Sequence, residues 1–237
     1  MDINSNRLIY GILLIFIILL SYLFSLEKYL ILILTIFVSK ELYMSKIYNN
    51  TNKYFLLSLL SVTSVNIFLI DFNLKIILFS CFFLIFISIY LKKYENEIFI
   101  LLNFLFLYSL FYLSNISVDY FYLVILLSFA NDTFAYIAGR LLKGPLIIPK
   151  ISPNKTWTGT SFSFLLSFFI LIYFDYPIII SIILSISLFF GDIYFSHIKR
   201  INNLKDFSQL LAGHGGILDR IDSMTLFSFI FLISLYL

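Results

Sequence analysis

The chain has 237 residues, of which 61% are hydrophobic, 20% aromatic and only 12% charged, and its formal net charge is +3. Soluble domains carry about 25% charged residues, so this composition excludes an ordinary soluble globular protein. Apolar runs of about 20 residues, long enough to cross a bilayer as helices, recur along the chain. We therefore predict an all-α, polytopic integral membrane protein.

Long apolar stretches predict about nine transmembrane helices, separated by short connections and two long polar loops. The predicted spans lie near residues 8–25, 28–44, 54–70, 75–92, 98–115, 119–138, 158–174, 177–195 and 217–237. The second span is the weakest, because it must extend past Lys40 and Glu41 to cross. If that segment is only re-entrant, the sidedness of everything before it changes. The first span lacks a small-residue cleavage site and is interpreted as a retained helix.

The basic residues predict the orientation, because lysine and arginine concentrate in short cytoplasmic loops. With nine spans and an outside N-terminus, 13 of the 16 basic residues fall on one side, and only Arg7, Lys28 and Lys75 fall on the other. The two long polar loops, about 139–157 and 196–218, then face the cytoplasm. Any reaction in these loops would draw on cytosolic substrates.

Short loops and the lack of an obvious transit peptide favour a bacterial inner membrane, with the active site facing the cytoplasm. We divide the chain into an N-terminal transmembrane scaffold, residues 1–118, and a C-terminal transmembrane catalytic region, residues 119–237. Trp157 and the many tyrosines are expected to anchor the protein at the membrane interface. No nucleic-acid partner is expected.

The first polar loop follows an acid that lies within an apolar span. Asp132 and Tyr136 are four residues apart and share a helix face. An intramembrane acid indicates function, although pairing with Arg140 or a hydrogen bond between helices would also explain it. In the segment 152–156, Pro153 is expected to start a helix. Lys155 and the nearby hydroxyls would meet a phosphate there, although anionic lipid alone would also explain such basic loops.

The second polar loop indicates chemistry at phosphate groups. Gly215 and Gly216 would let backbone amides approach an anion closely. Asp219 and Asp222 are expected on one face of the last helix, and Asp192 would add a third carboxylate. Carboxylates, water and substrate phosphates are the ligands that Mg²⁺ prefers. The alternative is a salt-bridged cap, in which Arg220 and Lys199 balance the acids.

The pattern S-x-x-K-R-x4-K-D, followed by H-G-G-x-x-D-R-x-D, resembles the signature of the phosphatidate cytidylyltransferase (CDP-diacylglycerol synthase) family. The matching residues are Ser196, Lys199, Arg200, Lys205, Asp206, His214, Gly215, Gly216, Asp219, Arg220 and Asp222. Upstream, residues 132–136, residues 152–156 and Gly191-Asp192 are also similar to that family. The likeness covers about residues 130–223. Ala212 and Thr158 depart from it, where proline and an acidic residue are common.

The resemblance implies transfer of a cytidylyl group from CTP to phosphatidate, giving CDP-diacylglycerol and pyrophosphate for phospholipid synthesis. The implied catalytic residues are Asp219, Asp192, Asp222, Lys199 and Arg200, and the three aspartates would hold Mg²⁺. The implied substrate-binding residues are Ser152, Lys155, Thr156, Ser196, Lys205, Asp206, His214, Gly215, Gly216 and Arg220. The resemblance also implies K⁺ as a second ion, contact with membrane lipids, and a homodimer.

Two alternative functions remain open. In a small transporter, the acids would line an ion or proton path, and they would be spread across the membrane depth in inverted halves. Here the polar groups cluster at one side and no such repeat is evident. In a related CTP-using enzyme, the acceptor would be a polyprenyl or ether lipid. Turnover compared on diacyl and isoprenoid lipid phosphates would separate this enzyme from a phosphatidate enzyme.

Overall fold

The computed structural model describes residues 16–45, 47, 95–208, 210 and 215–236. They form the helices α2 (Glu27–Met44), α6 (Glu95–Ile116), α7 (Val118–Leu142), α8 (Trp157–Tyr173), α9 (Ile178–Ile201) and α10 (Asp222–Ser234), and the strands β1 (Leu146–Ile148) and β2 (Ser152–Thr156). Residues 16–23 are also helical. The helices expected over residues 54–70 and 75–92 lie outside the described residues.

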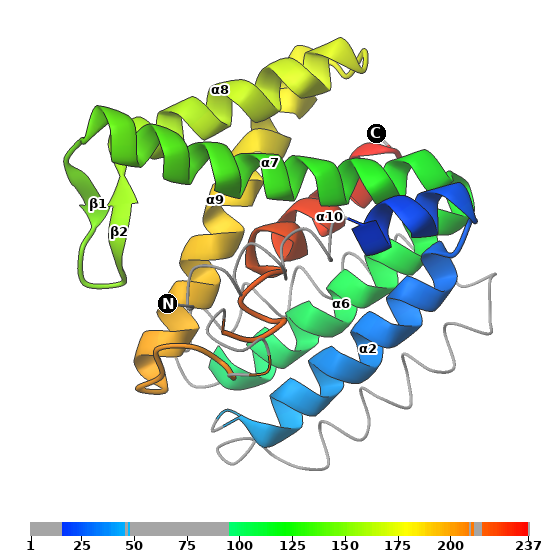
Figure 1. Ribbon diagram of the computed structural model, residues 1–237, viewed down its shortest axis with the longest axis horizontal. Coiled ribbons are helices and arrows are strands. Elements are labelled where there is room, and N and C mark those ends of the chain that lie inside the picture. The colour runs from blue at the N-terminus through cyan, green and yellow to red at the C-terminus, as the bar shows by residue number, and fades with distance from the viewer. Residues whose placement is uncertain (1–15, 46, 48–94, 209, 211–214, 237) are drawn as a thin grey trace.

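Helix α6 lies at the centre of the bundle, where it packs against α2, α7 and α10 (Figure 1). Helix α10 also packs against α9, and α7 runs beside α8. Serine hydroxyls join the helices: Ser109 Oγ donates to Ser228 Oγ at 2.8 Å between α6 and α10, and the hydroxyls of Ser128 and Ser223 join α7 to α10. Small hydroxyl side chains let membrane helices approach closely. These contacts hold α10 against α6 and α7.

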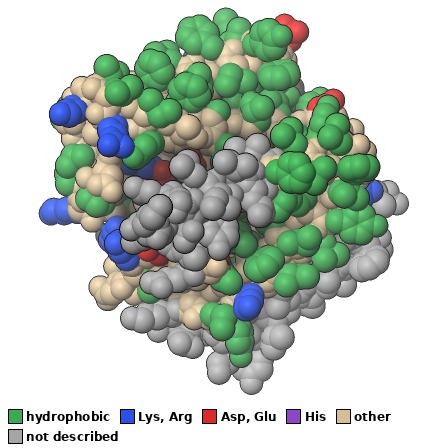
Figure 2. Space-filling model, in the orientation of Figure 1, with side chains coloured by type: hydrophobic (Ala, Val, Ile, Leu, Met, Phe, Trp, Pro, Cys, Tyr) green, Lys and Arg blue, Asp and Glu red, His purple; other side chains and the backbone are tan. Residues whose placement is uncertain are grey.

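Helices α6, α7 and α9 are long and apolar enough to cross a membrane, whereas α8 and α10 are shorter apolar helices. Large apolar side chains on α8 and α9 point outward, among them Phe169 (63% exposed), Tyr173 (83%) and Ile179 (73%). Figure 2 shows the wide apolar surface that such side chains form. Exposed apolar patches of this kind mark contact with lipid or with another protein. The described helices thus agree with the predicted helical membrane protein.

The end of α9 and the start of α10 differ from the prediction. Helix α9 continues to Ile201, so Ser196, Lys199 and Arg200 lie on a helix rather than in the predicted loop. It ends where the Asn202 side chain donates to Ile198 O at 3.0 Å and to Asn96 Oδ1 at 2.8 Å. Helix α10 begins at Asp222 and not near residue 217. Apolar run length predicts the membrane-embedded part of a helix, but backbone hydrogen bonding can continue into polar sequence.

The first polar loop contains a β-hairpin that the all-α prediction missed. Strands β1 and β2 pair antiparallel, with Leu146 opposite Thr156 and Ile148 opposite Ser152. Pro153 lies within β2 and does not start a helix. Instead, Thr156 caps α8, because its hydroxyl accepts from Gly159 N at 3.2 Å. Proline fits a strand of a two-stranded hairpin because its missing N–H can face away from the partner.

Candidate active site

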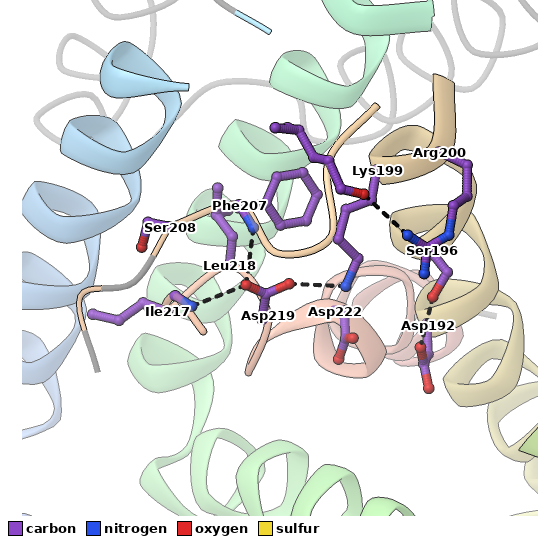
Figure 3. A network of polar contacts seen from close by, with 12 residues as sticks. Asp192, Ser196, Lys199, Arg200, Phe207, Ser208, Ile217, Leu218, Asp219 and Asp222 are labelled. Atoms are coloured by element: carbon purple, nitrogen blue, oxygen red, sulfur yellow. Dashed lines mark hydrogen bonds and ion pairs between the residues drawn. The ribbon is translucent and has the colours of Figure 1, made fainter. Parts of the chain in front are cut away.

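Asp219 lies in the turn before α10, where three donors hold its carboxylate. Oδ1 accepts from Lys199 Nζ at 2.8 Å, and Oδ2 accepts from Gly216 N at 2.9 Å and Phe207 N at 3.1 Å (Figure 3). The side chain is only 8% exposed. A carboxylate this buried requires such compensation. The Lys199–Asp219 pair is what the salt-bridged-cap alternative predicted for Lys199.

The predicted arrangement of Asp219 and Asp222 on one helix face is wrong. Asp222 is the first residue of α10, whereas Asp219 belongs to the preceding turn, in which Arg220 N and Ile221 N both donate to Ile217 O. Asp222 is buried and accepts from the Ser223 amide at 2.8 Å. The turn directs the Asp219 side chain toward residues 215–218, which we call the glycine segment, where Gly216 N donates to it. Phe207 N donates to the same oxygen.

The two glycines approach a carboxylate of the chain itself. Gly215 has φ of +78°, and a Cβ there would lie 2.8 Å from Asp219 Oδ2. A residue other than glycine would be strained at this φ and would also collide with Asp219. The backbone here therefore closely approaches carboxylates of the chain itself: Gly215 lies against Asp219, and Gly216 lies against Glu41.

Asp192 forms the second part of the site. It is paired with Lys155, which reaches across from β2 to α9. Ser196 Oγ, one helical turn further along α9, donates to Asp192 Oδ1 at 3.5 Å. The Lys155 ammonium also lies 5.4 Å from the centre of the Phe189 ring, within reach of a cation–π attraction. The hairpin lysine predicted to meet phosphate thus lies beside one of the predicted metal ligands.

Asp132, which our predicted set of site residues omitted, adds a third carboxylate near Asp192 and Asp222. Its Oδ2 accepts from Ser223 Oγ at 3.3 Å. The charges of Asp132 and Asp192 both repel Asp222, and Lys199 attracts it. The signal in the sequence was an acid inside an apolar span. Arg140, the alternative partner for this acid, donates to Tyr136 at 3.1 Å.

The carboxylates of the site can be compared with the ligands that Mg²⁺ requires. Among the described residues, no three acidic, histidine or cysteine side chains surround one point as metal ligands. Mg²⁺ usually needs only one or two carboxylates, with waters and substrate phosphates completing its shell. Carboxylates that repel one another also favour positive charge nearby, which Lys155 and Lys199 supply here. Asp192 and Asp222 are two carboxylates of the kind that such an ion uses, although Asp192 is paired with Lys155 here.

Other predicted residues lie further from this centre. Arg200 Nε donates to Ile151 O and its Nη1 to Leu204 O, both at 3.1 Å, so it ties the end of α9 to the hairpin. Ser152 lies in β2 and Thr156 caps α8. Three further side chains are exposed, those of Lys205, Asp206 and Arg220. His214 and the atypical Ala212 lie outside the described residues.

The network of Lys155, Asp192, Lys199, Asp219 and Asp222 therefore joins residues of both predicted polar loops. Comparison with known proteins gives the same family as the sequence motifs that contain these residues. The model of the cytidylyltransferase family matches residues 5–237. The chain belongs to the cytidylyltransferase family. The match includes the N-terminal half, where the signature itself has no residues.

Three relatives of the chain are named phosphatidate cytidylyltransferase. The chain is 40% identical over 123 residues to a phosphatidate cytidylyltransferase of Rickettsia conorii, a match that covers 45% of this chain and 54% of the relative. It is 39% identical over 116 residues to the Haemophilus influenzae protein of that name, covering 43% and 40% of the two chains. The corresponding Brucella abortus protein is 36% identical over 104 residues, covering 40% and 38%. The chain thus spans about half the length of the Rickettsia protein and about two fifths of the other two.

Proposed function

We propose that the protein transfers a cytidylyl group from CTP to phosphatidate, giving CDP-diacylglycerol and pyrophosphate. The observation that carries this proposal is the placement of two lysines at one end of apolar helices: Lys155 pairs with the half-buried Asp192, and Lys199 pairs with the buried Asp219. The lysines supply positive charge for phosphates, and the carboxylates supply oxygen ligands for a divalent cation. The membership of the cytidylyltransferase family and the names of the relatives support the same reaction.

In this reaction a phosphate oxygen of phosphatidate attacks the α-phosphorus of CTP. A new phosphorus–oxygen bond forms, the bond from the α-phosphorus to the bridging oxygen breaks, and pyrophosphate leaves with its electron pair. Such transfers depend mainly on positioning and on electrostatic stabilisation. We assign Lys199 and Lys155 to the phosphates, with Ser196 beside them. Arg200 holds the hairpin against α9.

We further propose that Asp192 and Asp222 hold Mg²⁺ together with substrate phosphate. Asp219 can contribute as well, since a carboxylate oxygen has two lone pairs and Lys199 occupies one of those on Oδ1. When bound, the ion would neutralise charge on the phosphates and on the leaving pyrophosphate. A second, monovalent ion, K⁺, and a homodimeric assembly remain proposals from family resemblance.

We also propose nine membrane spans, with the site facing the cytoplasm of a bacterial inner membrane. Basic side chains of the hairpin and of the end of α9 gather at one side of the molecule (Figures 1 and 2). Asp119, at the start of α7, and Asp175, in the turn between α8 and α9, line one pocket elsewhere in the molecule. The excess of basic residues supports a cytoplasmic position for the hairpin side. Such a site meets CTP from water while the acyl chains of phosphatidate stay in lipid.

The test is formation of CDP-lipid by purified protein from radiolabelled CTP and phosphatidate, with and without Mg²⁺, beside Asp219→Asn. We expect metal-dependent product from the wild type, and at least a 100-fold loss in the variant, because its carboxylate both pairs with Lys199 and orders the glycine segment. A polyprenyl phosphate and an ether-lipid phosphate serve as competing acceptors. Preference for either one would overturn the assignment of phosphatidate, and full activity of Asp219→Asn would overturn the site.

A further inference from the structure

Glu41 is a charged residue of α2 whose side chain is completely buried. Its Oε1 accepts from Ser208 Oγ and from Ile217 N, both at 2.7 Å, and its Oε2 accepts from Leu218 N at 2.8 Å. Burying a carboxylate is costly unless several donors compensate it. All three of these donors come from the segment between α9 and α10, which carries Asp219.

The glycine segment lies between two carboxylates. Three consecutive amides are shared between them: Gly216 N donates to Asp219, whereas Ile217 N and Leu218 N donate to Glu41. The fit at Gly216 is tight, because a Cβ there would lie 2.6 Å from both oxygens of Glu41. The turn that carries Asp219 is thus fixed by two groups: Glu41 of α2 binds its backbone, and Lys199 of α9 binds the Asp219 side chain.

A purely stabilising role would not require this geometry. Replacing buried charges by apolar side chains is often neutral or stabilising, so a buried carboxylate is weak support for stability alone. Here the Glu41 carboxylate binds the segment on both sides of the glycines: it accepts from Ser208 before them and from residues 217–218 after them. Its three hydrogen bonds oppose any shift of that segment away from α2.

We propose that Glu41 is a positioning residue for the candidate active site: it holds the backbone of residues 217–218 so that Asp219 meets Lys199. This inference rests on the proposed function, to which it adds a residue of the N-terminal half. Glu41 does not contact reacting atoms. It acts through the amides of Ile217 and Leu218 and through the hydroxyl of Ser208.

The test compares Glu41→Gln with Glu27→Gln in the full-length purified protein. Both residues are buried on α2, but Glu27 is at its other end, about 20 Å away along the axis. Neutral glutamine at position 41 keeps the side-chain length and turns one acceptor into a donor, so it cannot accept all three bonds. We measure kcat and KM for CTP, the melting temperature, and hydrogen exchange of peptides that contain residues 215–219.

We expect Glu41→Gln to lower kcat at least 10-fold, to change KM for CTP less than 3-fold, and to speed exchange at residues 217–218 at least 10-fold. Glu27→Gln should keep wild-type kcat and wild-type exchange in that peptide. If both variants lose stability and turnover in parallel, with no local change in exchange, Glu41 is merely a buried stabilising residue and the proposal fails.

Exchange also separates this inference from the proposed reaction. If the wild type forms no CDP-lipid but Glu41→Gln alone loosens residues 217–218, the reaction is wrong and the positioning role stands. If Glu41→Gln does not fold, Glu41→Asp replaces it, because the shorter carboxylate keeps the charge but cannot reach all three donors. Wild-type exchange and turnover in Glu41→Asp would overturn the proposal.

Discussion

The ammonium group of Lys199 interacts with the two acids at the start of the last helix. It donates to Asp219 Oδ1 at 2.8 Å, it attracts Asp222, and it lies 5.4 Å from the centre of the Phe207 ring. With 12% exposure of its side chain, solvent screens these charges only weakly. Without this ammonium group, Asp219 would lose its ion pair and Asp222 would lose a nearby positive charge.

We therefore expect Lys199→Gln to lower turnover about 100-fold, the scale seen when an enzyme loses one electrostatic contact in its active site. Breaking a buried pair should also cost about 3 kcal/mol of unfolding free energy. Radiolabelled CTP turnover and thermal unfolding in detergent check the two effects. Lys28→Gln, an exposed lysine on α2, is the control and should match the wild type. Wild-type turnover in Lys199→Gln would show that its charge is not required.

The contact between α9 and α10 determines how close the acids lie. A Cβ added at Gly191 would meet Asp222 O at 2.7 Å and Ser223 O at 3.1 Å. Glycine thus lets the backbone of α10 lie directly against α9, and the next residue, Asp192, lies beside Asp222 for this reason. A small residue at a helix crossing is a common device for close packing in membranes.

Gly191→Ala should therefore push α10 away from α9, at a cost of about 2 kcal/mol for overpacking, and should lower turnover more than 10-fold. Ser185→Ala is a matched control on the same helix. Its hydroxyl is buried and has no hydrogen-bond partner among the described residues. Thermal unfolding and CTP turnover are measured for both variants. Equal behaviour of the two would mean that the close contact at Gly191 is not needed.

The orientation in the membrane can be tested with single cysteines in a Cys81→Ser background. Lys150→Cys places a thiol in the exposed turn of the hairpin, and Asp175→Cys places one in the exposed turn between α8 and α9. With the site at the cytoplasmic face, a membrane-impermeant maleimide should label Lys150→Cys only in inside-out vesicles and Asp175→Cys only in right-side-out vesicles. Labelling of both from one side would contradict the proposed topology.

Apolar run length predicted where the described membrane helices lie, because transfer into lipid depends on composition over about 20 residues. Spans 98–115 and 158–174 agree with α6 and α8 to within three residues. Polar helix ends were missed, since the hydrogen bonding of α9 continues through Lys199 and Arg200. The hairpin was missed because Pro153 was interpreted as a helix start.

The candidate site was only partly predictable from the chain. The signature motif contained Lys199, Asp219 and the two glycines, and these do lie together. Glu41 and Leu218, however, are 177 positions apart in the chain. Their contact depends on how α2 packs, which no local pattern in one sequence records. In the sequence, Glu41 was only a charged residue that made the second predicted membrane span weaker than the others.

The α9 segment from Gly191 to Lys199 carries its functional groups on one face: Asp192, Ser196 and Lys199 follow at intervals of four and three residues. One residue inserted within this segment would turn everything after it by about 100°. Lys199 would then leave Asp219, even though Gly191 still met α10. Lipid-facing positions of this helix can exchange one apolar residue for another at little cost. We therefore expect an insertion in this segment to be tolerated less well than an exchange of apolar residues.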